Sequence, residues 1–388
     1  MFEAGAFIIA SLLTIPNGFG VNIHFTGEPR DLDLITEAGF KFIRMDFAWG
    51  GIEREKGVYN FESYDTLTDG CLKRGIHPLY ILDYSNKLYE ESNSIRTAEG
   101  REAFAKFAET AVKRYEGKEI LWEIWNEPNL NQFWNPQPSI DAYTELVETT
   151  IPRIKKAVPS ATVIAPATSG IPMDWLEACF KKGMLDNIDA LSVHPYRTPM
   201  PETVIKDYEN LRKLIKSHAK GKDIPIISGE WGYSIINWDK NRILDEQQAQ
   251  YLVRMFLINM YQNVLVSIWY DWKDDGTDPN EREHHFGTVT NDLKPKNAYL
   301  ALKALAHILD GYSVVERLDL GNDEIFALKL KKGENQAFAI WTTGDNHEVT
   351  LPIKDKKGVI YDMYGKMSEW KGEKITLSQS PQYLVIGL

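Results

Sequence analysis

Two glutamates are the residues of this sequence best placed to do chemistry. Glu127 lies in the stretch LWEIWNEPNLNQFW, between an amide and a proline, and Glu230 lies in ISGEWGY, 103 residues further along the chain. Two facing carboxylates can divide the roles of proton donor and nucleophile. At about 5 Å apart they can cleave a glycosidic bond with retention, whereas a gap of about 6.5–9.5 Å admits a water and gives inversion.

Such a pair needs a scaffold that brings distant strand ends together. Apolar runs alternate with amphipathic segments, and the runs begin at residues 19, 41, 77, 121, 162, 188, 225 and 264. Strands alternating with helices imply a parallel sheet, and eight of each predict an α/β fold of the (β/α)8 TIM-barrel type. A doubly wound sheet is the competing arrangement, but no glycine-rich phosphate turn follows a strand. In a barrel, Glu127 would end the fourth strand and Glu230 the seventh, across one mouth.

The pattern changes near residue 310. Short β-rich runs then follow one another, separated by Gly-Asn, Lys-Gly-Glu-Asn and Gly-Asp-Asn, which predicts a small C-terminal antiparallel β-sandwich. We therefore expect a catalytic barrel over residues 19–310 and a sandwich domain over 311–388. The segment 1–18 contains an apolar run that we expect to form a core strand or a short helix, and a strand there is a candidate addition to the sandwich. It lacks the basic start and the small-residue cleavage site of a signal peptide.

Composition narrows the range of partners. The formal net charge is −11 and no block of Lys and Arg occurs, which argues against nucleic acid and anionic membranes. The 11 Trp, 18 Tyr and 16 Phe suit the faces of sugar rings as well as a core. No apolar run is long enough to span a membrane. Cys71 and Cys179 fit neither a disulfide framework nor metal-binding spacing, so we expect them to be core residues.

Six strand-end motifs together resemble the clan A glycoside hydrolases: GVNIHFT, IRMDFAW, WEIWNEPNL, SVHPY, ISGEWGY and SIWYDW. Within the clan, the sequence is most similar to family 39, and there to its branch of endo-acting hydrolases of bacterial exopolysaccharides. The resemblance implies a retaining enzyme for β-linked oligo- or polysaccharide, a carbohydrate partner, no cofactor, and a monomer. It also favours a secreted or periplasmic location.

The same resemblance assigns roles to residues. Glu127 would be the general acid and then the general base, and Glu230 the nucleophile. Asn126 would bind the sugar 2-OH, while Arg44, His194 and Tyr196 would surround the nucleophile. Trp269 would be the aromatic floor under the sugar, and Trp134 and Trp231 are candidate stacking platforms. Apart from the resemblance, His24, Asp46 and Asp83 lie at strand ends, where they could bind substrate hydroxyls.

Several alternatives stay open at this stage. Glu127 and Glu230 could instead belong to a structural ion pair, and Arg44 could be a core partner of Glu123. His24 could be a satisfied buried group, and Trp134 could only anchor its loop. Residues 271–287 form an acidic loop whose spacing fits neither an EF-hand nor a His-x3-His site, so we expect a solvated loop and no metal. The alternative functions are a non-catalytic carbohydrate-binding barrel, an exo-acting enzyme resembling a β-xylosidase, and a metal-dependent hydrolase, which would need His-x-His on a strand. The sequence leaves open the sugar and linkage.

Overall fold

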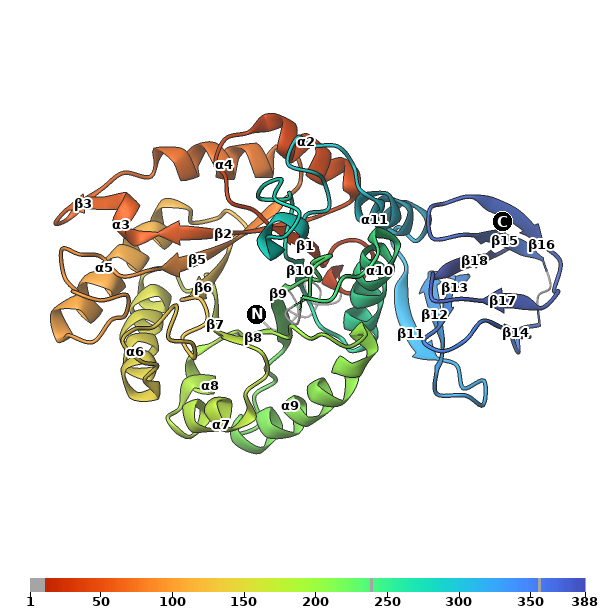
Figure 1. Ribbon diagram of the computed structural model, residues 1–388. Helices are drawn as coiled ribbons and strands as arrows, with labels where there is room; N and C mark the ends of the chain where they lie inside the picture. The colour runs from red at the N-terminus through yellow and green to blue at the C-terminus, as the bar shows by residue number, and fades with distance from the viewer. Residues whose placement is uncertain (1–10, 238–239, 355–356, 388) are drawn as a thin grey trace.

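Eight parallel strands close into a barrel in the computed structural model, which describes residues 11–237, 240–354 and 357–387. Neighbouring strands follow chain order around the ring, and the last pairs with the first (Figure 1). The predicted TIM barrel is therefore confirmed. Its strands are β1 (Phe19–Asn22), β2 (Phe42–Ala48), β5 (His77–Asp83), β6 (Leu121–Ile124), β7 (Thr162–Ser169), β8 (Ala190–His194), β9 (Ile226–Trp231) and β10 (Ser267–Trp269).

Helices connect these strands and form the outer layer. Local signals set some of their ends. Thr97 and Ser139 accept backbone N–H bonds at the start of the helices that begin at Ala98 and Ile140. Gly39, with a φ of 96°, ends the helix Pro29–Ala38. The helices of this layer are α2 (Pro29–Ala38), α3 (Trp49–Ile52), α4 (Glu62–Leu72), α5 (Ala98–Arg114), α6 (Ile140–Ala157), α7 (Met173–Lys181), α8 (Met184–Asn187), α9 (Val204–His218), α10 (Asp245–Tyr261) and α11 (Asn297–Ile308). Short 3-10 turns, η1 (Pro201–Thr203) and η2 (Arg282–His285), and a hairpin of β3 (Glu53–Glu55) and β4 (Val58–Tyr59) lie in the connecting loops.

The barrel interior is filled by an apolar layer and capped by a polar one. Phe42, Ile81, Ile164, Ile227 and Ile268, from five different strands, belong to one buried cluster. Side chains alternate across a strand, so Arg44 and Asp46 face inward with Phe42, and Asp83 faces inward with Ile81. The inward positions nearest the carboxyl ends of the strands are thus polar. This end of a TIM barrel is where active sites are built.

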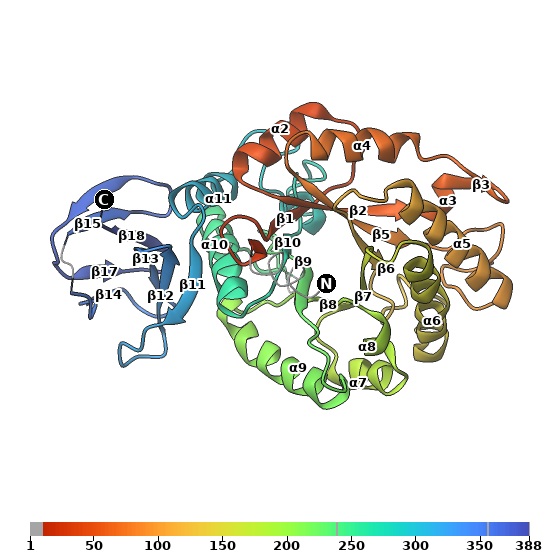
Figure 2. The ribbon, with the colours of Figure 1, turned by 180° about the vertical axis from the view of Figure 1, so that it is seen from behind.

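The C-terminal residues form a small sandwich beside the barrel. A six-stranded antiparallel sheet in the order β11-β12-β13-β18-β15-β16 faces a two-stranded sheet, β14-β17. One face of the larger sheet packs on the smaller sheet, and its opposite face, including Phe326 and Trp341, joins the core shared with the barrel. Both views show the sandwich against α10 and α11 (Figures 1 and 2). Its strands are β11 (Ser313–Arg317), β12 (Ile325–Lys332), β13 (Asn335–Thr342), β14 (His347–Val349), β15 (Gly358–Tyr361), β16 (Met367–Trp370), β17 (Ile375–Leu377) and β18 (Gln382–Ile386).

The N-terminal segment contributes no strand within residues 11–18. A short helical stretch at Ser11 and Leu12 is followed by turns, and the Ile15 N–H bonds to the carbonyl of Tyr312 at 2.8 Å. The rest of the predicted apolar run lies outside the described residues. Among the helices of the described segments, none is long and apolar enough to cross a membrane.

Candidate active site

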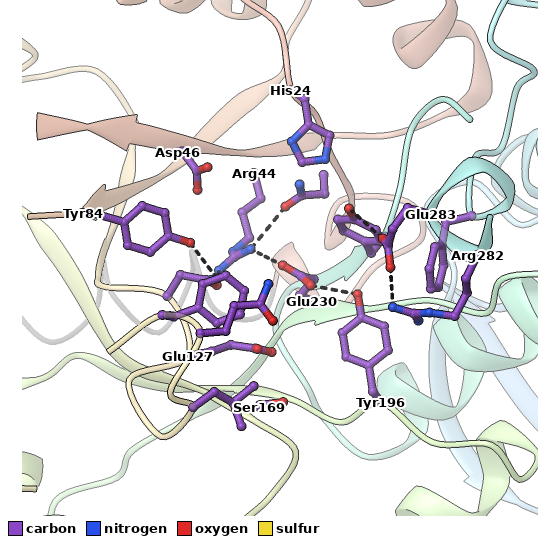
Figure 3. Close-up of a pocket in the computed structure, with 17 residues that line it drawn as sticks. His24, Arg44, Asp46, Tyr84, Glu127, Ser169, Tyr196, Glu230, Arg282 and Glu283 are labelled. Atoms are coloured by element: carbon purple, nitrogen blue, oxygen red, sulfur yellow. Dashed lines mark hydrogen bonds and ion pairs between the residues drawn. The ribbon is translucent and has the colours of Figure 1, made fainter. Parts of the chain in front are cut away.

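A pocket of about 320 Å³ lies at the carboxyl ends of the barrel strands and contains both predicted glutamates (Figure 3). One carboxylate oxygen of Glu127 and one of Glu230 lie within 4.8 Å of each other. The other lining residues are Asn22, His24, Arg44, Asp46, Tyr84, Asn126, Leu130, Gln132, Phe133, Ser169, Tyr196, Tyr270, Arg282, Glu283 and Phe286.

The chain leaves β6 through a bend that aims Glu127 into the pocket. Trp125 and Glu127 both have positive φ, 70° and 44°, which side-chain-bearing residues seldom adopt. The Glu127 N–H is bonded to the carbonyl of Ala167 on β7 at 2.9 Å, so the neighbouring strand holds this conformation. Asn126, between the two bent residues, also reaches the pocket.

A β-bulge in β9 directs Glu230 inward. Ser267 and Trp269 of β10 pair with Ser228 and Trp231, so β9 has one extra residue between these pairs. Gly229 lies in this bulge, and a Cβ there would come within 2.4 Å of the Ser192 hydroxyl. The glycine in ISGEWGY therefore allows β9 to lie close to β8 beside the nucleophile candidate.

Arg44 connects most of the polar groups of the site. Its Nε donates to Glu123 Oε2 at 2.8 Å, its Nη1 to Glu230 Oε2 at 2.6 Å, and its Nη2 to Asn126 Oδ1 at 2.8 Å. The side chain is 1% exposed. The two roles weighed for Arg44, a core partner of Glu123 and a partner of Glu230, are therefore fulfilled together. Tyr196 donates a second hydrogen bond to Glu230, at Oε1 and 2.8 Å.

His194 lies between Arg44 and Glu127, and this position defines its tautomer. Its Nε2 is 3.3 Å from Arg44 Nη2, and its Nδ1 is 2.9 Å from Glu127 Oε1. Because a guanidinium can only donate, Nε2 must accept, so the ring proton is on Nδ1 and is donated to Glu127. Burial and the charge of Arg44 lower the His194 pKa to about 4, which keeps the ring neutral. The sequence predicted that His194 lies near the nucleophile, but its direct contact is with the other glutamate.

The carboxyl group of Glu127 ionises near neutral pH. Burial raises its pKa to about 7, although the charge of Arg44 and a hydrogen bond from Ser169 oppose this. The residue is only 6% exposed. A carboxyl with this pKa can hold a proton at neutral pH and also release it, as a group that acts in turn as acid and base must.

The remaining polar candidates divide into pocket-lining and buried residues. Asn126, His24 and Asp46 line the pocket, and the Asn126 amide also donates to the Tyr84 hydroxyl at 3.0 Å. The His24 side chain is 46% exposed and lies 3.3 Å from Asp271, so it is not a buried core group. Burial lowers the His24 pKa, but the hydrogen bond and charge of Asp271 outweigh it and raise the value to about 9. Asp83 is fully buried and does not line the pocket, so it was wrongly predicted as a substrate contact.

The three tryptophans predicted to stack on the sugar do not do so. Trp134, Trp231 and Trp269 are each 0% exposed, and none lines the pocket. Trp134 packs between Trp125 and Tyr143. Trp231 and Trp269 are paired in register, and both point away from the barrel interior. The bulge turns Trp231 to the outer side of β9. Trp269 is outward because the preceding residue, Ile268, faces inward and side chains alternate along a strand.

Other aromatic residues, which the sequence did not single out, line the pocket instead. Tyr84 and Phe133 stack with ring centroids 6.0 Å apart and an interplanar angle of 10°, while Tyr270 and Phe286 meet edge to face at 5.1 Å. Tyr84 directly follows a strand, which was an available signal. Phe133 lies on the loop after β6, where residue type alone does not show whether Phe133 or Trp134 faces the cavity.

The acidic loop contributes side chains to the rim of the pocket. Arg282 and Glu283 of η2 line it and form an ion pair. Within the described segments, the group of metal-type side chains involving this loop is His24, Asp271 and Asp275, and it includes neither His284 nor His285. His284 accepts from the Asp278 backbone N–H at 3.0 Å, and His285 Nε2 lies 3.1 Å from the Asp278 carbonyl oxygen.

Taken together, the barrel, the paired glutamates just after β6 and on β9, and the arginine on β2 define the class of clan A glycoside hydrolases. Residues 13–276 match the family model described as Cellulase (glycosyl hydrolase family 5), and the chain belongs to this family. The resemblance to clan A seen in the sequence is thereby confirmed.

Solved structures and a curated relative extend the comparison. A family 39 glycoside hydrolase from the gut symbiont Bacteroides cellulosilyticus WH2 is similar over 96% of this chain and 81% of that chain, with a TM-score of 0.84 and 27% identity. A family 39 β-xylosidase from Caulobacter crescentus shares the fold over 96% of both chains, with a TM-score of 0.72 and 18% identity. The β-xylosidase of Geobacillus stearothermophilus is 27% identical over 207 residues. That match covers 46% of this chain and only 40% of the relative's length.

Proposed function

We propose that this protein is a retaining glycoside hydrolase that cleaves β-linked oligo- or polysaccharide by double displacement, with Glu127 as acid/base and Glu230 as nucleophile. The observation that carries the proposal is the separation of the two carboxylates. Their nearest oxygens lie within 4.8 Å, and retaining enzymes have carboxyl groups about 5–5.5 Å apart, whereas inverting enzymes need about 6.5–9.5 Å.

In the first step, a Glu230 oxygen attacks the anomeric carbon and the bond to the leaving oxygen breaks. The proton of Glu127 passes to that oxygen, so the leaving group departs as an alcohol. His194 donates to Glu127 Oε1, which leaves Oε2 to carry the transferable proton. In the second step, Glu127 takes a proton from water, the water oxygen attacks the anomeric carbon, and Glu230 is released as a carboxylate.

The groups around the carboxylates support this division of roles. Arg44 donates to Oε2 of Glu230 and Tyr196 donates to Oε1, which holds the carboxyl group of the proposed nucleophile in one orientation. The Asn126 amide lies in the same pocket, where it would bind the sugar 2-OH, a contact that strengthens as the transition state forms. Tyr84 and Phe133 offer the apolar ring faces that a sugar needs.

For the substrate, we propose endo-acting cleavage of an exopolysaccharide, on the basis of the sequence motifs. An exo-acting function resembling that of a β-xylosidase is the second candidate, because a curated β-xylosidase is among the relatives. Digestion of a β-linked polysaccharide with product sizing separates them. Endo action gives a ladder of intermediate oligosaccharides, whereas exo action releases monosaccharide from the start.

Proton NMR of the first-formed product tests the mechanism. We expect the anomeric configuration of the substrate, and an inverted product would exclude double displacement. Glu230→Ala should abolish hydrolysis by removing the nucleophile, a loss on the order of 10⁴-fold or more. Azide should restore turnover in this variant and give a glycosyl azide of inverted configuration. Full activity in Glu230→Ala would contradict the assignment.

A further inference from the structure

Building on the proposed function, we propose that Asp46 binds a ring hydroxyl of the sugar in the pocket. Asp83 acts behind it as a positioning residue, which holds the Asp46 carboxylate by donating a hydrogen bond to it. Nothing in the double-displacement scheme uses either residue, yet both lie on the inward face of adjacent barrel strands.

Strand register places the two carboxyls together. On β2 and β5, Asp46 is level with Ile81 and Ala48 is level with Asp83, so the two aspartates are diagonal neighbours on the same face. Their carboxyls are within hydrogen-bonding reach of each other. Asp46 lines the pocket, whereas Asp83 is 0% exposed behind it.

The surroundings of Asp83 favour its protonated form. Within the described part of the chain, no N–H or O–H donor reaches either of its oxygens. A buried carboxylate without donors is costly, and a second negative charge in contact makes it costlier. Burial raises the Asp83 pKa well above its usual range, and the Asp46 charge raises it further, against the opposing charge of Arg44.

The other titratable groups around Asp83 either raise its pKa further or are uncharged. Glu123 on β6 adds a further negative charge. Tyr64 on α4 and Tyr84, which follows β5, are neutral phenols whose pKa values are raised, first by burial. A protonated carboxyl must donate its proton to an acceptor, and Asp46 is the carboxylate within reach.

Asp46 is thereby left with free acceptor capacity toward the cavity. In Figure 3 its carboxyl is drawn on the Tyr84 side of the Arg44 side chain, away from Glu127. A sugar whose anomeric carbon is at Glu230 would present a hydroxyl remote from that carbon to Asp46. A carboxyl group held from behind selects for such a hydroxyl, because a sugar lacking it leaves an acceptor oxygen of Asp46 without its hydrogen bond in the complex.

The first test uses the para-nitrophenyl β-glycoside that the wild type cleaves fastest among xyloside, glucoside and mannoside, with its monodeoxy analogues. Asp46→Ala should lower kcat/KM about 10- to 100-fold, as expected for a lost hydrogen bond to a charged group. For the wild type, kcat/KM on the deoxy analogue that lacks the bound hydroxyl should be lower than on the parent glycoside by a similar factor. For Asp46→Ala, the same analogue and the parent glycoside should have nearly equal kcat/KM. If every deoxy analogue loses the same factor in both proteins, Asp46 does not bind a hydroxyl and the proposal is overturned.

The second test separates positioning from mere packing at Asp83. Asp83→Ala should lower kcat/KM about tenfold, whereas Asp83→Asn, whose amide still donates to Asp46, should restore it to within about threefold of the wild type. Asp83→Val replaces the alanine variant if that fails to fold. A folded Asp83→Asn as impaired as the apolar variant would overturn the donor role.

The third test does not depend on activity. Infrared difference spectra are recorded well above the pKa of about 7 of Glu127 and Asp271, so that these two groups are ionised. They should show a carboxylic acid C=O band that is present in the wild type, lost in Asp83→Asn and kept in Asp46→Asn. The reverse pattern, or no such band, would overturn the assignment of the proton. If the wild type cleaves neither these aryl glycosides nor a β-linked polysaccharide, the proposed function fails, but these spectra still decide whether the carboxyl pair exists.

Discussion

At the residue scale, Glu127 and Glu230 differ in what their carboxyl oxygens contact. Glu230 accepts from a guanidinium and a phenol, while Glu127 accepts from a neutral imidazole and is more deeply buried. Positive donors stabilise a carboxylate, and burial stabilises the protonated acid. The two environments therefore differ in the way expected for the proposed nucleophile, Glu230, and the proposed acid, Glu127, although both residues have the same side chain.

Replacing Glu127, the proposed acid, should lower kcat/KM most for substrates whose leaving group needs a proton in order to depart. We expect Glu127→Ala to lower kcat/KM on an alkyl glycoside or an oligosaccharide by about 10²–10⁴-fold, the usual value of general acid catalysis. An aryl glycoside with an acidic phenol should lose far less in the first step, because its leaving group departs as an anion. Steady-state kinetics with a series of phenols checks this, and equal losses across the series would contradict the acid role.

The pH profile should report the same proton. Glu127 is competent as an acid only while protonated, so wild-type kcat/KM should fall as the pH rises above about 7, the pKa raised by burial. In Glu127→Ala, assayed on an activated aryl glycoside, this basic limb should disappear. Its persistence would assign the limb to another group, such as Asp271, whose pKa burial also raises to about 7.

Strand-end position was enough to predict most of the polar site. In a parallel barrel all carboxyl ends meet at one mouth, so Arg44, Asn126, Tyr196 and the two glutamates could be placed together from their spacing and the clan A motifs. The contact of His194 with Glu127 could not be predicted, because it depends on the ring orientation that Arg44 imposes. Asp83 was wrongly predicted to contact the substrate, because a side chain at the end of a strand can be covered by neighbouring side chains and so lie outside the pocket.

At the element scale, a single bulge explains why the prediction for Trp231 failed. Regular alternation from the inward Ile227 would place Trp231 inward, but the extra residue in β9 lets Glu230 face the pocket and turns Trp231 outward. Trp269, its partner on β10, is outward as well. A β-bulge leaves no fixed pattern in a single sequence. The prediction that Trp231 stacks on the sugar therefore relied on residue type and could not take the turned backbone into account.

The loop after β6 allows a matched test of which aromatic residue meets the substrate. Phe133 lines the pocket and the adjacent Trp134 is buried behind it. Phe133→Ala should lower kcat/KM about tenfold, the equivalent of roughly 1–1.5 kcal/mol of ring contact. Trp134→Phe should leave kcat/KM near the wild-type value but lower the unfolding free energy by about 1–2 kcal/mol through the space it leaves.

Kinetics and denaturant unfolding of both variants distinguish these outcomes. A large kinetic defect in Trp134→Phe with an unchanged Phe133→Ala would restore the tryptophan as the platform.

At the scale of the whole molecule, the sandwich supports the loop that carries part of the active site. Arg254 of α10 binds both carboxylate oxygens of Glu202 at 2.7 Å, and the Trp341 indole on β13 donates to Glu202 Oε1 at 2.8 Å. Glu202 lies on the β8–α9 loop, the same loop that carries Tyr196, the hydrogen-bond donor to Glu230. The three side chains are buried, so this contact connects the C-terminal sheet to the surroundings of Glu230 through one loop.

This connection predicts that a small change in the sandwich destabilises the whole protein. Trp341→Phe keeps an aromatic ring but removes the N–H that donates to a charged, buried carboxylate, which should lower the unfolding free energy by about 1.5–3 kcal/mol. Trp175→Phe is the matched control, because within the described residues the Trp175 indole N–H has no hydrogen-bond partner. Its cost should be only about 1 kcal/mol. Denaturant unfolding followed by circular dichroism measures both, and since the loop is held at Glu202, Trp341→Phe should also raise the sensitivity of activity to temperature. Equal destabilisation by the two substitutions would mean that the Glu202 contact contributes nothing beyond the volume of the indole.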